Sequence, residues 1–196
     1  LLTTVTAGFD RVSMHGVRRD LLRRQAASVG LPCLEMEIPS PCSDAVYEEK
    51  MGALLAGLRA EGFTHVVFGD LFLADLRAWR EERLARAGMT GVFPLWLRDT
   101  KALASEMVEG GARATLVCID PRKLDASYAG RAFDAALLAD LPRGVDPCGE
   151  NGEFHTFASD GPAFRWPIDT RPGEVVTRDG FVFADLLAVE RERDLP

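Results

Sequence analysis

The chain has 196 residues, of which 47% are hydrophobic, and its formal net charge at pH 7 is −7. This length and composition suffice for a real core in one or two domains, and the acidic balance argues against nucleic acid or an anionic membrane as a partner. No apolar run approaches a membrane span, no signal peptide is visible, and the four cysteines lack the spacing of a zinc site. We therefore expect a cytoplasmic protein with reduced thiols and no bound structural metal.

The first part of the chain alternates predicted strands and helices. In chain order these are a strand at 1–6, a helix ending at Gly30, a strand at 33–38, a helix from Asp44 to Gly62, a strand at 64–68 and a helix at 75–87. The strand at 64–68 is a continuous apolar run, which is typical of a strand buried on both faces. Strand–helix repeats of this length predict crossover connections and a parallel sheet.

The pattern changes at Pro94-Leu95-Trp96. The elements predicted beyond it are a helix at 100–109, a strand at 114–119, a helix at 133–141 and short strands at 154–158, 163–168, 174–177 and 181–187. Gly and Pro turns between the short strands indicate antiparallel hairpins. We therefore divide the chain into an α/β domain at 1–97 and a smaller α+β domain at 98–196.

Residues 144–157, hereafter the signature loop, concentrate the reactive side chains of the chain. They include Asp146, Cys148, Glu150, Asn151, Glu153, His155 and Thr156. A turn needs only one or two polar residues to satisfy its backbone, so this density predicts a functional site built on a loop. The structural alternative is a loop held by its own side chains, with Asn151 in the left-handed region and Asp146 as a cap.

Glu150, Glu153 and His155 are the predicted catalytic residues of this loop. Three chemistries suit them: accepting a proton from an ammonium nucleophile, binding an ammonium or a cationic substrate, or holding a divalent metal. We expect Asp146, Asn151 and Thr156 to bind substrate. Cys148 has no paired histidine in the local sequence, so we interpret it as packing or as polar lining of the substrate site.

Gly69 and Asp70 follow the strand at 64–68, at its carboxyl end. Ligands of open parallel sheets lie beyond those ends, where Asp70 would orient a Mg²⁺-bound water or a ribose hydroxyl. The alternative is a turn in which Asp70 caps the next helix. On that helix Arg77 and Glu81 have the spacing of a surface ion pair, while the guanidinium of Arg80 suits an anion. We expect Arg80 and Glu81 to bind substrate.

Several motifs occur in a fixed order along the chain. They are Met14-His15-Gly16, Phe68-Gly69-Asp70, Arg77-x-x-Arg80-Glu81, Phe93-Pro94-Leu95-Trp96 and the signature loop. Together they resemble the diphthine–ammonia ligase family over essentially all 196 residues. The resemblance implies an N-type ATP pyrophosphatase fold, a doubly wound, Rossmann-like parallel sheet that binds ATP with Mg²⁺. It implies nucleotide binding by Gly69 and Asp70, and places the turn at His15 beside the adenine.

The resemblance also implies an ATP-dependent ligase. A carboxylate would be activated as an acyl-adenylate with release of pyrophosphate, and ammonia would then displace AMP. The implied partners are ATP, ammonia and a carboxylate acceptor, which is modified elongation factor 2 in an archaeon or a eukaryote and another small molecule or protein in a bacterium. A homodimer is compatible with it; nucleic acid and membrane are not implied. The alternative function is a nucleotide-binding regulatory or sensor protein of the same fold.

One family motif is absent. The family carries a Ser-Gly-Gly-Lys-Asp-Ser phosphate loop after its first strand, and this sequence contains none. The chain opens without Met, on the strand-like Leu1-Leu2-Thr3-Thr4-Val5. We expect the first strand and the phosphate loop to lie upstream; the alternative is a natural protein that lacks them.

Overall fold

The computed structural model describes residues 1–189. Its elements are β1 (Leu2–Thr6), β2 (Arg11–Val12), α1 (Arg19–Val29), β3 (Leu34–Ile38), α2 (Asp44–Ala60), β4 (His65–Val67), α3 (Ala74–Arg86), β5 (Thr90–Val92), α4 (Thr100–Glu109), β6 (Arg113–Ile119), a 3-10 turn (Ala126–Tyr128), α5 (Ala135–Asp140), β7 (Phe154–Asp160), β8 (Thr170–Arg178) and β9 (Phe181–Ala188). Every predicted helix is confirmed to within a few residues. None of the helices in this part of the chain combines the length and apolarity needed to cross a membrane.

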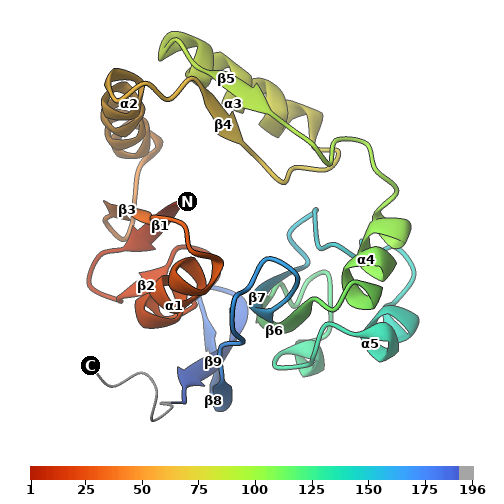
Figure 1. Cartoon of the computed structure of the whole chain (residues 1–196). Helices are drawn as coiled ribbons and strands as arrows, with labels where there is room; N and C mark the ends of the chain where they lie inside the picture. Colours follow the sequence, from red (N-terminus) through yellow and green to blue (C-terminus); the bar gives the residue numbers. More distant parts are fainter. Residues whose placement is uncertain (190–196) are drawn as a thin grey trace.

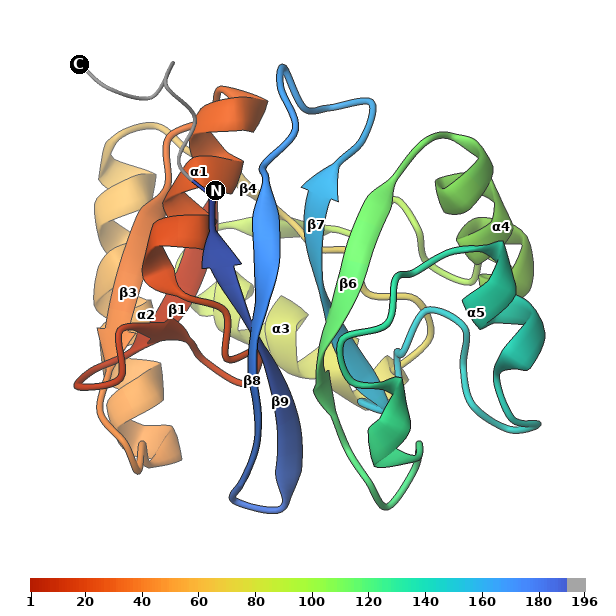
Figure 2. The ribbon, with the colours of Figure 1, turned by 90° about the horizontal axis from the view of Figure 1, so that it is seen from below.

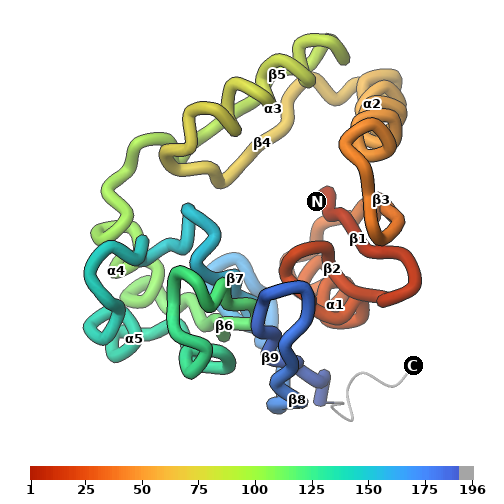
Figure 3. Tube along the Cα trace, turned by 180° about the vertical axis from the view of Figure 1, so that it is seen from behind, coloured from red at the N-terminus to blue at the C-terminus, as the bar shows by residue number. Residues whose placement is uncertain are grey.

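The strands form three sheets. β1 and β3 are parallel, with Leu2 opposite Leu34, and β2 adds antiparallel to β1. β4 and β5 form a second parallel pair, and β7-β6-β9-β8 is an antiparallel sheet. An α/β protein with parallel strands first and antiparallel strands later is thus confirmed. The predicted single doubly wound sheet is not formed by residues 1–189, because the parallel strands fall into two separate pairs (Figures 1 and 3).

Helix α1 joins the N-terminal part of the chain to the antiparallel sheet. Its buried side chain Leu21 belongs to one cluster with Val117 of β6, Phe157 of β7 and Leu186 of β9. At the end of α1, the Ser28 hydroxyl donates to the carbonyl of Trp166 at 2.5 Å. A single core therefore spans the proposed boundary at 97/98, and the division into two domains stays a prediction.

A second core lies on the other side of the antiparallel sheet. There α4, α5 and the 3-10 turn cover β6, and the fully buried members of the cluster include Leu116, Ile119, Leu124 and Leu137. Figure 2 shows α4 and α5 next to each other at the outer flank of β6. The signature loop is anchored to this core, because its side chains Val145 and Cys148 pack against the cluster.

Two predictions about the elements were wrong, and so was the alternative role given to Asp70. Residues 163–168 form turns and bends instead of a strand, because Pro162 and Pro167 deny backbone donors to a ladder. β4 is not buried on both faces: the side chain of Val67 is 66% exposed, because only the face of Val66 packs against the cluster that contains Leu55 and Leu84. Asp70 does not cap α3, whose N-cap residue is Leu73.

Candidate functional site

The signature loop is organised around Asp146, whose side chain is buried. Its Oδ2 accepts hydrogen bonds from the amides of Cys148 at 3.2 Å and Glu150 at 2.9 Å. Capping by Asp146 is thus confirmed. The left-handed positions belong to Gly149 and Gly152, so the expectation of a left-handed Asn151 was wrong. A Cβ at Gly149 would lie 2.7 Å from the carbonyl oxygen of Phe154, so the loop closes only with glycine there.

Glu153 lies at the buried end of the loop, with 3% of its surface exposed. Its Oε1 accepts from the amide of Asp146 and from Nδ2 of Asn151, each at 3.0 Å. Its Oε2 is the one buried side-chain oxygen or nitrogen without a hydrogen-bond partner in the described part of the chain. Buried acceptors are nearly always paired, so an open carboxylate oxygen marks a place where a donor is to be received.

The side chain of Glu150 binds outside the signature loop, to the segment between β4 and α3. Its Oε1 accepts from the amides of Leu71 at 2.7 Å and Phe72 at 3.4 Å, in the segment between β4 and α3. The carbonyl of the buried Leu71 accepts in turn from the amide of Leu97. Glu150 therefore fastens the signature loop next to Gly69 and Asp70, the residues at the carboxyl end of β4.

His155 lies on β7, where it stacks on His15 with ring centroids 4.3 Å apart. His15 reaches this position from the turn after β2, in which Met14 and Gly16 both have positive φ. Burial lowers the pKa of both rings, and the neighbouring His15 adds to the effect at His155, whose pKa falls to about 4. Both imidazoles are therefore neutral near pH 7, and His155 is suited to exchange hydrogen bonds, not to carry charge.

The remaining predicted residues of the loop have structural partners. The Cys148 thiol donates to the carbonyl of Thr100 at 3.4 Å, and burial raises its pKa to about 11, which suits packing and not nucleophilic attack. Thr156 pairs with Leu116 across the sheet. Within residues 1–189, no three His, Cys, Asp or Glu side chains are placed to hold a metal ion, so the metal interpretation of the loop gains no support.

Arg80 and Asp70 form an ion pair at 2.7 Å, and the guanidinium of Arg80 lies over the ring of Phe68. Glu81 pairs with Arg77 at 2.9 Å, as its spacing predicted. No hydrogen bond or ion pair in the described part of the chain joins Arg80 or Glu81 to the signature loop. The structure thus stacks His155 on His15 and pairs Arg80 with Asp70, whereas no hydrogen bond, ion pair or ring contact in the described residues joins Glu150, Glu153 and His155 to one another. The roles predicted for all of them stay predictions.

The sequence analysis missed two residues after β6 that hydrogen-bond to the backbone of the signature loop. The amide of Asp120, after β6, donates to the carbonyl of Glu153 at 3.0 Å, and the ammonium of Lys123 donates to the carbonyl of Asn151 at 2.5 Å. The carboxylate of Asp120 is buried and takes a bidentate pair from Arg122, which lowers its pKa. The available signal was an aspartate directly after a predicted strand, the same placement as Asp70.

Comparison with known proteins agrees with this arrangement. Residues 99–191, which contain the signature loop, match the family model described as the Diphthamide synthase C-terminal domain. The chain is 31% identical over 118 residues to the diphthine–ammonia ligase of Bos taurus, covering 57% of this chain and 44% of that protein. It is 31% identical over 143 residues to the diphthine–ammonia ligase of Danio rerio, covering 69% of this chain and 56% of that protein. It is 30% identical over 118 residues to that of Homo sapiens, covering 57% of this chain and 44% of that protein.

The matched proteins are named as ligases, which is the class that the likeness supports. Residues 99–191 thus belong to the diphthamide synthase C-terminal domain family, and the chain is similar to diphthine–ammonia ligases. It spans about half the length of the curated relatives that it matches.

Proposed function

We propose that this protein is part of an ATP-dependent ligase that forms an amide from a carboxylate and ammonia. The acceptor carboxylate attacks the α-phosphorus of ATP and pyrophosphate leaves; ammonia then attacks the acyl carbon and AMP leaves. The activation is needed because a carboxylate oxygen is a poor leaving group and AMP a better one. The relatives' name indicates diphthine as the first acceptor to try, on elongation factor 2.

The observation that carries this proposal is the open Oε2 of Glu153. A buried carboxylate oxygen without a partner attracts an N–H donor, and ammonium is the N–H donor that the proposed reaction requires. Glu153 would hold the ammonium by its charge and take one proton from it, which frees the electron pair of ammonia for attack on the acyl carbon. A second proton would leave the nitrogen for solvent as AMP departs and the neutral amide forms.

The other loop residues would position the reactants. Neutral His155, braced by the ring of His15, would exchange a hydrogen bond with the acyl group without adding charge. Glu150 would act as a positioning residue, because it holds the loop against the carboxyl end of β4. That end is where a nucleotide lies in an open parallel sheet, so the bond from Glu150 would bring the ATP half and the ammonia half together.

The described residues fit ATP only in part. Gly69 and Asp70 stand at the carboxyl end of β4, the kind of strand end at which open parallel sheets bind nucleotides, but residues 1–189 contain no glycine-rich phosphate loop. Magnesium would neutralise the phosphates, with Asp70 as the one oxygen ligand that the predicted site supplies. Cytoplasmic location and the doubly wound sheet belong to the same proposal.

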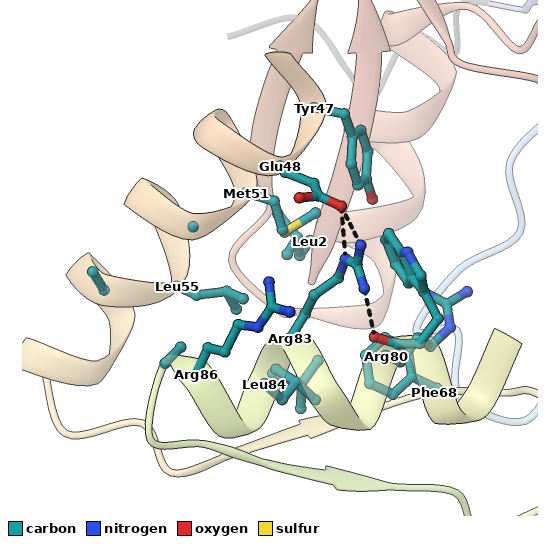
Figure 4. Close-up of a pocket in the computed structure, with 15 residues that line it drawn as sticks. Leu2, Tyr47, Glu48, Met51, Leu55, Phe68, Arg80, Arg83, Leu84 and Arg86 are labelled. Atoms are coloured by element: carbon teal, nitrogen blue, oxygen red, sulfur yellow. Dashed lines mark hydrogen bonds and ion pairs between the residues drawn. The ribbon is translucent and has the colours of Figure 1, made fainter. Parts of the chain in front are cut away.

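We further propose that one more parallel strand, followed by the phosphate loop, completes the ATP half between β1 and β4. A pocket of about 280 Å³ separates the two parallel pairs, with Leu2 of β1 on one side and Phe68, after β4, on the other. Its walls are mostly apolar, with Met51 and Leu55 of α2 and Leu84 of α3, and they also carry the charged side chains of Glu48, Arg80, Arg83 and Arg86 (Figure 4). An open strand edge beside an apolar pocket is suited to a strand buried on both faces.

The products of ATP test the proposed reaction. With Mg·ATP, ammonium and diphthine-bearing elongation factor 2, a form of the protein that carries the phosphate loop should release AMP and pyrophosphate in equal amounts, and only when ammonium and acceptor are both present. Chromatographic quantification of the nucleotides measures the ratio. Release of ADP and inorganic phosphate would rule out adenylation.

A further inference from the structure

A second cavity lies outside the proposed reacting centre. It is a groove of about 620 Å³ between α4, α5 and the segment 141–147 that leads into the signature loop. Its apolar lining includes Leu138 of α5 and Val145, and its polar lining comes from Lys101 and Ser105 of α4 and from Arg143. Cavities of this size that combine an apolar wall with a few polar groups are typical small-molecule sites.

The charge of this groove is opposite to that of the chain. Lys101 and Arg143 line it, and no acidic residue does, although the chain has a net charge of −7. Within residues 1–189 neither cation has an ion-pair or hydrogen-bond partner. The acids nearest in sequence have other partners: Asp99 accepts from the amide of Ala102, and Asp140 pairs with Arg131. Asp146 accepts from the amides of Cys148 and Glu150. A concave surface lined by one sign of charge concentrates ligands of the other sign.

The two cations belong to different walls. Lys101 lies in the first turn of α4, one turn before Ser105 and on the same side of the helix. Arg143 lies in a turn between Pro142 and Val145, in which the amide of Val145 donates to the carbonyl of Pro142. An acidic group between the walls would meet a guanidinium on one side and an ammonium on the other. Guanidinium forks match the oxygens of a carboxylate or a phosphate.

We propose that the α4–α5 groove is a binding site for a small organic anion. Lys101 and Arg143 hold its carboxylate or phosphate, and its apolar part lies against Leu138 and Val145. The groove also shares residues 144–147 with the signature loop, and Cys148 binds the carbonyl of Thr100 at the start of α4. The outer face of the loop is thus where the anion lies, while Glu153 is on the inner side.

Binding is tested without ATP or ammonia, so the result is independent of ligase activity. The probes are phenyl phosphate and benzoate, which distinguish a phosphate from a carboxylate ligand, and benzyl alcohol, which has the ring without the charge. Titrations followed by amide chemical shifts at low salt report both affinity and location. We expect at least one anion to bind, benzyl alcohol not to bind, and the shifts to lie in residues 101–105 and 138–147.

The K101Q/R143Q variant should lower that affinity at least about ten-fold, since each lost charge contact is worth roughly a factor of ten. The matched control is K50Q/R171Q, which removes two exposed cations that also lack partners in the described residues and lie outside the groove. The proposal is overturned if neither anion binds, if the shifts of the unaltered protein lie elsewhere, or if both double variants lose affinity equally.

Discussion

The Glu153→Gln variant is expected to form amide about 10²–10⁴ times more slowly than the unaltered protein, which is the usual effect of losing a general base. Glutamine keeps the size of the side chain, and its oxygen can still accept from the amide of Asp146 and from Asn151. It removes the negative charge, and its NH2 group, a donor, takes the place of the open acceptor Oε2. We therefore expect the melting temperature to remain close to that of the unaltered protein. Initial rates of amide formation and a thermal melt measure the two quantities.

The control for this variant is Glu174→Gln, an exposed glutamate of β8 without a partner in the described residues, which should change neither quantity. A Glu153→Gln protein that folds and keeps its full rate would place the chemistry elsewhere. A protein that fails to fold would make Glu153 a structural clasp for the loop instead of the ammonium site.

The second large effect concerns the proposed additional strand. A longer form of the protein that carries this strand and the phosphate loop should bind Mg·ATP at least about ten times more tightly than residues 1–196, because the phosphate contacts come with it. Alternate amides of β4 donate to β5, and those of His65 and Val67 point to the opposite side. These two amides should become protected from hydrogen exchange, because the added strand would accept their hydrogen bonds. Calorimetry and exchange mass spectrometry measure the two changes.

A matched form with proline at the centre of the added strand separates pairing from mere length. Proline has no amide hydrogen, so the strand cannot complete the ladder and the protection of β4 should be lost. Equal exchange of β4 in the short and long forms would mean that the two parallel pairs are not halves of one sheet.

The local features of the fold could be predicted from the sequence. Leu21, Leu22 and Ala26 recur on one face of α1, and Gly30 ends that helix with φ of 76°, as a glycine C-cap should. Burial was harder to predict, because it depends on neighbours that are distant in sequence. The run through Val67 has the composition of a strand buried on both faces, yet the exposure of Val67 is set by whether another element covers its face of β4.

The site shows the same limit. The density of polar residues in 144–157 identified the loop, but not which side chain turns inward. Glu150 binds amides at Leu71 and Phe72, which are 79 and 78 residues away, and the stacking of His155 on His15 also joins distant segments. No spacing in a single sequence encodes such pairs. For the same reason the unpartnered Oε2 of Glu153, on which the proposed role rests, became apparent only in the folded chain.

The fate of the acceptor's carboxylate oxygen tests the proposed adenylation most directly. Diphthine labelled with ¹⁸O in its carboxylate is incubated with Mg·ATP, ammonium and the form of the protein that carries the phosphate loop, and the AMP is examined by mass spectrometry. If the carboxylate attacks the α-phosphorus, each AMP formed carries one ¹⁸O, because the oxygen that ammonia displaces leaves with the phosphate. Unlabelled AMP, or ¹⁸O found in inorganic phosphate, would contradict the formation of an acyl-adenylate.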